Sequence, residues 1–95
     1  MKIAGLEVPQ VENLDMLNIY DKILLALIVN NNNNGINVEN LRKILSKNSR
    51  YNRILENNIL QSCLNKLIEM NIIKSIFNLD TNEEIFTINN MVEVG

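Results

Sequence analysis

The strongest pattern along this chain is a run of seven apolar residues, Ile23 to Val29. A helix that is apolar on every face is buried on more than one side. We expect this helix to begin with a cap at Asn13 or Asp15, because their short side chains can accept from the free N–H groups of a first turn. Two explanations of the run remain open, a central core helix or a helix that also forms a dimer interface.

Two further helices are predicted by narrower apolar stripes. The second helix is expected over residues 38–47, with Asn37 as its N-cap. The third helix is expected over at least about residues 56–70 and should end at Asn71 in a left-handed conformation. The apolar positions of their stripes are Leu41, Ile44 and Leu45, then Leu60, Leu64, Leu67 and Ile68.

A hairpin is expected after the third helix. Residues 72–79 are typical of a strand, 80–84 of a turn and 85–88 of a return strand. Residues 1–12 lack a clear period and are expected to form an N-terminal arm with a short strand at 3–8, and residues 91–95 a C-terminal tail. The domain between them, 13–90, includes a solvated loop in the Asn run 30–34. The pattern therefore predicts one α+β domain of three helices and a small antiparallel hairpin.

The residue inventory argues against an enzyme. The chain has no His and a single Cys, Cys63, which we expect to be a small buried hydrophobe. A disulfide within the chain and a Cys-type or His-type metal site are thereby excluded. The three glycines are scattered at 5, 35 and 95, so no Gly-rich phosphate loop is present, and the adjacent Glu83 and Glu84 point apart if extended. We predict no catalytic residues, no cofactor and no metal.

The compartment is suggested by the same inventory. One Cys suits a reducing environment, and the start of the chain lacks the apolar core of a signal peptide. The run 23–29 is far too short to cross a bilayer. We expect a cytoplasmic protein, or a nuclear one if the source is eukaryotic, with no membrane partner.

The distribution of charge is more informative than the net charge of −2. Residues 42–53 hold five basic side chains and no acidic one: Arg42, Lys43, Lys47, Arg50 and Arg53. A basic cluster is the electrostatic footprint of nucleic-acid binding, but it also occurs in an ordinary solvated loop. Both interpretations stay open from the sequence.

The order of these elements resembles a winged helix-turn-helix domain. Residues 35–41 resemble the short first strand and the start of the second helix of that family. Leu64, Leu67 and Asn71, followed by two isoleucines, resemble the end of a recognition helix and the entry into a wing. The resemblance covers about 14–89. It implies a small DNA-binding protein, either a transcriptional regulator or a partition or replication accessory, since most such domains bind DNA.

One segment departs from simple regulators of this family. Residues 46–55 separate the second and third helices, so either the third helix starts early, near Asn48 or Ser49, or an extra turn is inserted. Longer connections of this kind occur in the winged-helix domains of cullins and of the cullin-like subunit of the anaphase-promoting complex, which bind proteins. The alternative function is therefore a protein-interaction domain whose basic stretch meets an acidic partner.

The resemblance also implies which residues would contact DNA. The third helix would read base edges with side chains opposite its apolar stripe: Asn58, Ser62 and Asn65. Phosphate contacts would come from Arg42, Lys43, Lys47, Arg50, Arg53 and Lys66. The acids at the wing tip, Asp80, Glu83 and Glu84, argue against a wing that touches phosphate. We expect duplex DNA as the partner of a homodimer formed through the first helix or the terminal segments.

Overall fold

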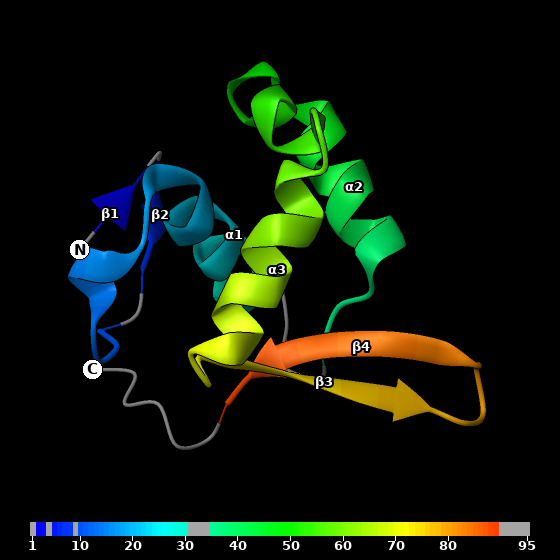
Figure 1. Cartoon of the computed structure of the whole chain (residues 1–95). Coiled ribbons are helices and arrows are strands. Elements are labelled where there is room, and N and C mark those ends of the chain that lie inside the picture. Colours follow the sequence, from blue (N-terminus) through cyan, green and yellow to red (C-terminus); the bar gives the residue numbers. More distant parts are fainter. Residues whose placement is uncertain (1, 4, 9, 31–34, 90–95) are drawn as a thin grey trace.

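The computed structural model describes residues 2–3, 5–8, 10–30 and 35–89, which form one α+β unit (Figure 1). Its elements are β1 (Lys2–Ile3), β2 (Leu6–Glu7), η1 (Leu14–Met16), α1 (Ile19–Asn30), α2 (Val38–Lys47), η2 (Ser49–Leu55), α3 (Ile59–Glu69), β3 (Ile73–Asn78) and β4 (Glu83–Ile88). The α+β class is confirmed, with two antiparallel hairpins where one was expected. The expected tail 91–95 and the Asn run after Asn30 lie outside the described residues. None of the helices in the described residues is long and apolar enough to span a membrane.

Helix α1 is the centre of the core. Every residue from Ile23 to Ile28 is buried within the single chain. The N-terminal hairpin contacts one part of α1, and α3 and β4 contact others. Because one chain covers these residues, the core-helix explanation of the apolar run is confirmed. Residues 23–28 therefore keep no exposed apolar face for a second copy.

The start of α1 differs from the sequence-based expectation. Asn13 lies in the left-handed region (φ 62°) before the short η1 helix, and its side chain caps nothing. The cap of α1 is instead Asn18, whose Oδ1 accepts from the Asp21 N–H at 2.9 Å. In return the Asn18 N–H donates to Asp21 Oδ2 at 3.1 Å. This reciprocal capping box satisfies two free N–H groups at once, and it overrides the weaker local signals at 13 and 15.

The N-terminal segment is part of the fold. Strands β1 and β2 pair in antiparallel fashion, with Lys2 opposite Glu7 and Ile3 opposite Leu6, where only a short strand was expected. Val8 and Val11 are buried in the same core as α1. The Asn30 side chain also donates to the Glu7 carbonyl at 2.7 Å, which ties the end of α1 to β2.

Local signals predicted the start of α2 and the end of α3, whereas α3 begins at Ile59, later than the expected start at about residue 56. Asn37 caps α2 by accepting from the Asn40 N–H at 2.8 Å. After α3, Asn71 takes the left-handed conformation (φ 60°) that turns the chain into the hairpin, as expected. Leu64 and Leu67 are fully buried at the centre of the α3 stripe, whereas Ile68 is half-buried.

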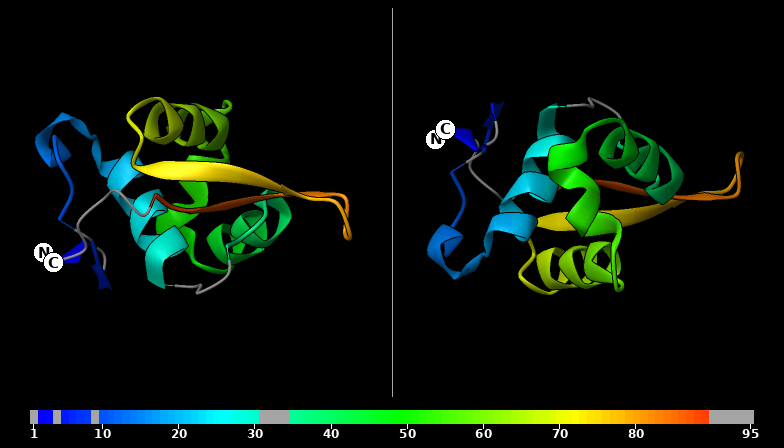
Figure 2. Two further views of the ribbon diagram at one scale, coloured as in Figure 1. Left: turned by 90° about the horizontal axis from the view of Figure 1, so that it is seen from below. Right: turned by 90° about the horizontal axis from the view of Figure 1, so that it is seen from above.

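Strands β3 and β4 form an antiparallel hairpin that extends beyond the helices (Figure 2). At its base, Ile73 and Phe86 are buried against the helical body. Ile36, on the way from α1 to α2, exchanges two backbone hydrogen bonds with Phe86 (2.9 and 2.8 Å) and so adds a short third segment beside β4. Gly35 precedes it at φ 96°, where an added Cβ would overlap the Ile85 side chain.

Replacing Leu64 with Ala should lower the free energy of unfolding by about 3 kcal/mol, because the substitution leaves a cavity at the centre of the α3 stripe. The matched control is Leu79→Ala, since Leu79 is 85% exposed and its loss should change stability by no more than about 0.5 kcal/mol. Urea unfolding followed by far-UV circular dichroism measures both. Equal midpoints for the two variants would contradict the burial of Leu64.

Candidate nucleic-acid interface

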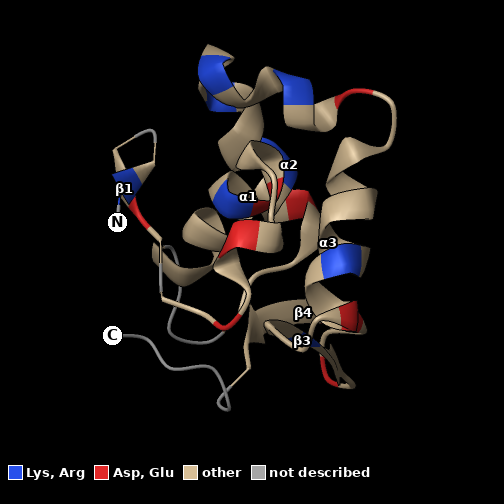
Figure 3. Ribbon diagram, turned by 60° about the vertical axis from the view of Figure 1, so that its left-hand side comes forward, with Lys and Arg blue, Asp and Glu red and all other residues tan. Residues whose placement is uncertain are grey.

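Five basic side chains on α2 and η2 make up what we call the basic surface: Arg42, Lys43, Lys47, Arg50 and Arg53. All five are exposed, and none forms an ion pair with another of the described residues. Leu41 and Leu45 anchor α2 in the core, which leaves its basic positions facing solvent. Figure 3 shows the Lys and Arg segments of α2 and η2 in the upper half of the molecule. The charge of the basic surface is therefore available to a partner.

The connection from α2 to α3 is an inserted 3-10 helix rather than an early start of α3. Asn48 ends α2 with extended backbone, and its Oδ1 accepts from the Arg50 N–H at 3.0 Å to begin η2. Tyr51 and Ile54 are buried on the inner side of η2. Arg50 and Arg53 lie on its exposed side. The inserted helix is thus packed on the body of the domain through Tyr51 and Ile54, and two of the five basic side chains face solvent.

Helix α3 begins directly after η2, at a double reversal of the chain. Asn57 and Asn58 both have positive φ, 49° and 61°, and the Asn58 side chain makes no capping hydrogen bond. Ser62 and Asn65 follow on the exposed side of α3. Gln61 Nε2 donates to Asn65 Oδ1 at 3.0 Å, which orients the Asn65 amide. The structure thus brings the three base-edge candidates to the exposed side and start of α3.

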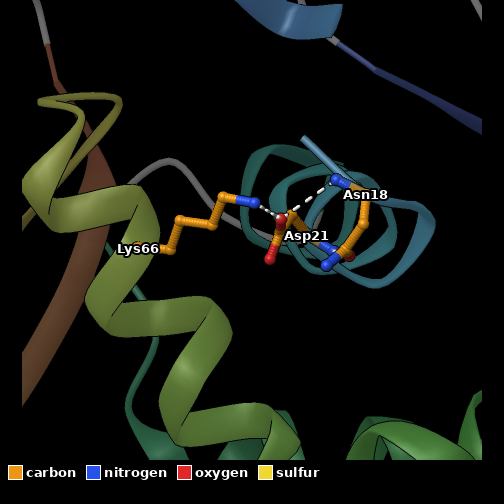
Figure 4. A network of polar contacts seen from close by, with 3 residues as sticks. All are labelled: Asn18, Asp21 and Lys66. Carbon is orange, nitrogen blue, oxygen red and sulfur yellow. Dashed lines mark hydrogen bonds and ion pairs between the residues drawn. The ribbon is translucent and has the colours of Figure 1, made fainter. Parts of the chain in front are cut away.

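Lys66 occupies a different environment from the other expected phosphate contacts. Its ammonium lies 2.9 Å from Asp21 Oδ2, and its side chain is 38% exposed, whereas that of Asp21 is only 1% exposed (Figure 4). Asp21 is the buried carboxylate of the α1 capping box, so the ion pair joins the start of α1 to α3. A Lys66 ammonium held in this way is less available to phosphate than the basic surface.

Cys63 lies one turn before Lys66 and is buried. The pKa of its thiol is raised from 9.0 to about 12, chiefly by burial and further by a hydrogen bond to Asp21 and the negative charge of Asp21. The nearby Lys66 charge acts in the opposite direction. A thiol that stays protonated at neutral pH is a poor nucleophile, which agrees with the expected role as a small buried side chain.

The hairpin end is acidic and apolar. Asp80, Glu83 and Glu84 are exposed there, and Glu84 accepts from the Ser75 hydroxyl at 2.6 Å. Asn78 uses its Oδ1 to hold the turn, accepting from the Asp80 N–H at 2.9 Å. This end of the molecule is unsuited to phosphate.

Sequence reasoning missed two features of this region. The first is the Asn18–Asp21–Lys66 network, for which the spacing of a polar cap and an acid three residues later was an available signal. The second is a set of exposed apolar side chains at the hairpin end, Ile76, Phe77 and Leu79. Their exposure depends on how far the hairpin extends beyond the helices, and no local pattern reports that. Among the described residues, no group of three or more His, Cys, Asp or Glu side chains could hold a metal ion.

No protein-family model, curated protein or solved structure matches this chain.

The Cys63 thiol should make stability depend on pH in the alkaline range. The thiol ionises with a pKa of 9.0 in the unfolded chain and about 12 in the folded one, so its contribution is complete below pH 9 and is lost as pH rises towards 12. Relative to Cys63→Ala, the free energy of unfolding of the wild type should fall by up to about 1.4 kcal/mol per pH unit above about pH 9. Urea unfolding at about pH 8 and about pH 10 measures this difference; parallel curves for the two proteins would contradict it.

Proposed function

We propose that this chain is a winged helix-turn-helix domain that binds duplex DNA. The observation that carries the proposal is the basic surface: five exposed cations, held on α2 and η2 beside the start of α3, that form no ion pair with any other described residue. The order of α1, the short segment at Ile36, α2, α3 and the β3–β4 hairpin supports the winged-helix assignment, since it follows the element order of that family.

The basic surface would supply the affinity. Cationic side chains that neutralise phosphates release condensed counterions, and this term dominates non-specific binding to DNA. Contacts within the described residues satisfy none of the five charges, so they can act on a phosphate backbone without first losing an internal partner. The net charge of −2 is no obstacle, because salt screens the distant acids over roughly 10 Å.

The exposed side of α3 would supply base contacts. Asn65 and Ser62 can donate to or accept from base edges, and Asn pairs well with adenine. Asn58 is the weakest of the three candidates for a base contact. Its positive φ already accounts for an Asn at this position, because Asn tolerates the left-handed conformation. DNA would lie across α2, η2 and α3 and away from the acidic hairpin end, because like charges repel.

A protein-interaction function is the second candidate. Two observations favour it: the inserted η2 helix and the three exposed acids at the hairpin end. In that case the basic surface would bind an acidic protein surface.

Fluorescence anisotropy with a mixed A/T-rich duplex, at low and at near-physiological salt, separates the two candidate functions. Binding that weakens steeply with salt supports the DNA-binding function. The absence of binding even at low salt excludes that function.

Replacing Arg50 and Arg53 together with Ala should weaken DNA binding and reduce the slope of log K against log salt by about 2, one for each lost phosphate contact. The matched control is Lys2→Ala with Lys22→Ala, which removes the same charge outside the basic surface and should leave the slope unchanged. Equal slopes for the two double variants would exclude Arg50 and Arg53 from the interface.

Replacing Asn65 with Ala should act differently. If this amide contacts a base, its loss should reduce discrimination between duplex sequences by about tenfold, whereas the salt slope should stay at its wild-type value. Competition between the preferred duplex and a duplex with its A·T pairs replaced measures the change. A uniform loss across all sequences would show that Asn65 does not read bases.

A further inference from the structure

Strand β3 has one free edge. Among the described residues it pairs with β4 on one side and with no strand on the other. Helix α3 contacts β3 and lies on this side of the hairpin (Figure 2). Ile73, at the base, is buried, but Ser75, Ile76 and Phe77 further out are exposed. The outer half of β3 therefore presents an open strand edge to solvent.

The backbone groups on that edge follow from the neighbouring hydrogen bonds. Phe86 exchanges its N–H and C=O with Ile36, so these groups point away from β3. Ser75 is opposite Phe86, and by the alternation of antiparallel pairs its own N–H and C=O point outward. The same holds for residues two positions away, Ile73 and Phe77. Ile73 is buried, but Ser75 and Phe77 are exposed, and exposed backbone groups of this kind are a template for pairing with another strand.

We propose that this edge pairs with the same edge of a second copy of the chain, which makes a continuous four-stranded sheet across a two-fold axis. The proposal does not depend on DNA binding. It rests on the free edge together with the exposed apolar side chains beside it, Ile76 at 46% and Phe77 at 54% exposed. Native proteins usually protect such edges, and a second copy offers the matching surface.

The charges and apolar residues select one register. With the two-fold axis at Ile76, Ser75 and Phe77 of the two copies exchange backbone hydrogen bonds and Ile76 meets its own copy. Ile76 and Ile85 are opposite each other within the hairpin, so four isoleucines would form one apolar row across the sheet. The exposed outer half of β3 is then covered by residues 74–78 of the second copy, and the pairing ends before Ile73, where α3 lies beside the strand.

The same register brings opposite charges together. Lys74 would lie opposite Asn78 of the second copy, and Asn78 is paired with Glu83 on β4. Lys74 and that Glu83 would share a face at two strand spacings, about 10 Å between Cα atoms, which their long side chains can bridge. Two such ion pairs would form, one on each side of the axis. Charge complementarity therefore favours a second copy as the occupant.

Sedimentation equilibrium tests the association directly. A contact along one strand edge is small, so we expect a weak dimer that is visible as the concentration rises to about 1 mM. Ile76→Lys should weaken it by about tenfold or more, because two like charges would meet at the axis. Lys74→Glu should also weaken it, and Lys74→Glu with Glu83→Lys should restore it. Circular dichroism checks that each variant stays folded.

A covalent test fixes the register. In a Cys63→Ala background, Ile76→Cys should oxidise to a disulfide-linked dimer. The Cα atoms of directly opposed residues at a non-hydrogen-bonded position lie about 4.5 Å apart, which is within the range that a disulfide spans. The control is Leu79→Cys, which is even more exposed but would not meet its copy in this register. A wild type that stays monomeric to about 1 mM would overturn the proposal. So would a dimer that Ile76→Lys leaves intact, or equal crosslinking of the two Cys variants.

Discussion

The burial of residues 23–28 of α1 on every side is the constraint on which the rest of this structure depends. An apolar helix surface of this extent must be covered, and in a chain of 95 residues elements from both ends of the sequence contribute to the cover. The N-terminal hairpin, α3 and β4 all contact α1. The N-terminal residues are therefore committed to the core, and α3 is fixed against α1 by a buried carboxylate as well as by apolar contact. An ion pair of this kind is sensitive to geometry, so it favours one position of α3 over its neighbours.

Local signals predicted the elements whose boundaries depend on a few adjacent residues. Helix α2 follows from the Asn37 cap and its apolar stripe, and the stop at Asn71 follows from the tolerance of Asn for positive φ. The predicted start of α1 was wrong because Asn13 and Asp15 are as suitable for an N-cap as Asn18 by residue type. Only the reciprocal hydrogen bonds between Asn18 and Asp21 distinguish Asn18. The sequence of η2 allows two interpretations, an early start of α3 or an inserted turn, because a 3-10 turn has no apolar period to recognise.

The candidate site was predictable to the extent that it depends on exposure. Arg42, Lys43 and Lys47 lie between the apolar positions of α2, so their exposure follows from the stripe. Lys66 has the same charge, but its ion pair depends on the packing of α3 against α1, which no single segment encodes. The opposite charges of the basic surface and the hairpin end are likewise far apart in space only because the hairpin extends away from the helices. The positions of these charged side chains depend on tertiary packing, and they determine which charges can contact the same partner.

The asparagines have one more consequence. Five described residues other than Gly take a positive φ, and all five are Asn: Asn13, Asn57, Asn58, Asn71 and Asn82. Glycine would take the same conformation, but it leaves the unfolded chain freer and so loses more entropy on folding. With Asn at these reversals the unfolded ensemble is more restricted than a glycine-rich equivalent would be. Part of the stability of this small domain therefore arises in its unfolded state and corresponds to no contact in the folded one.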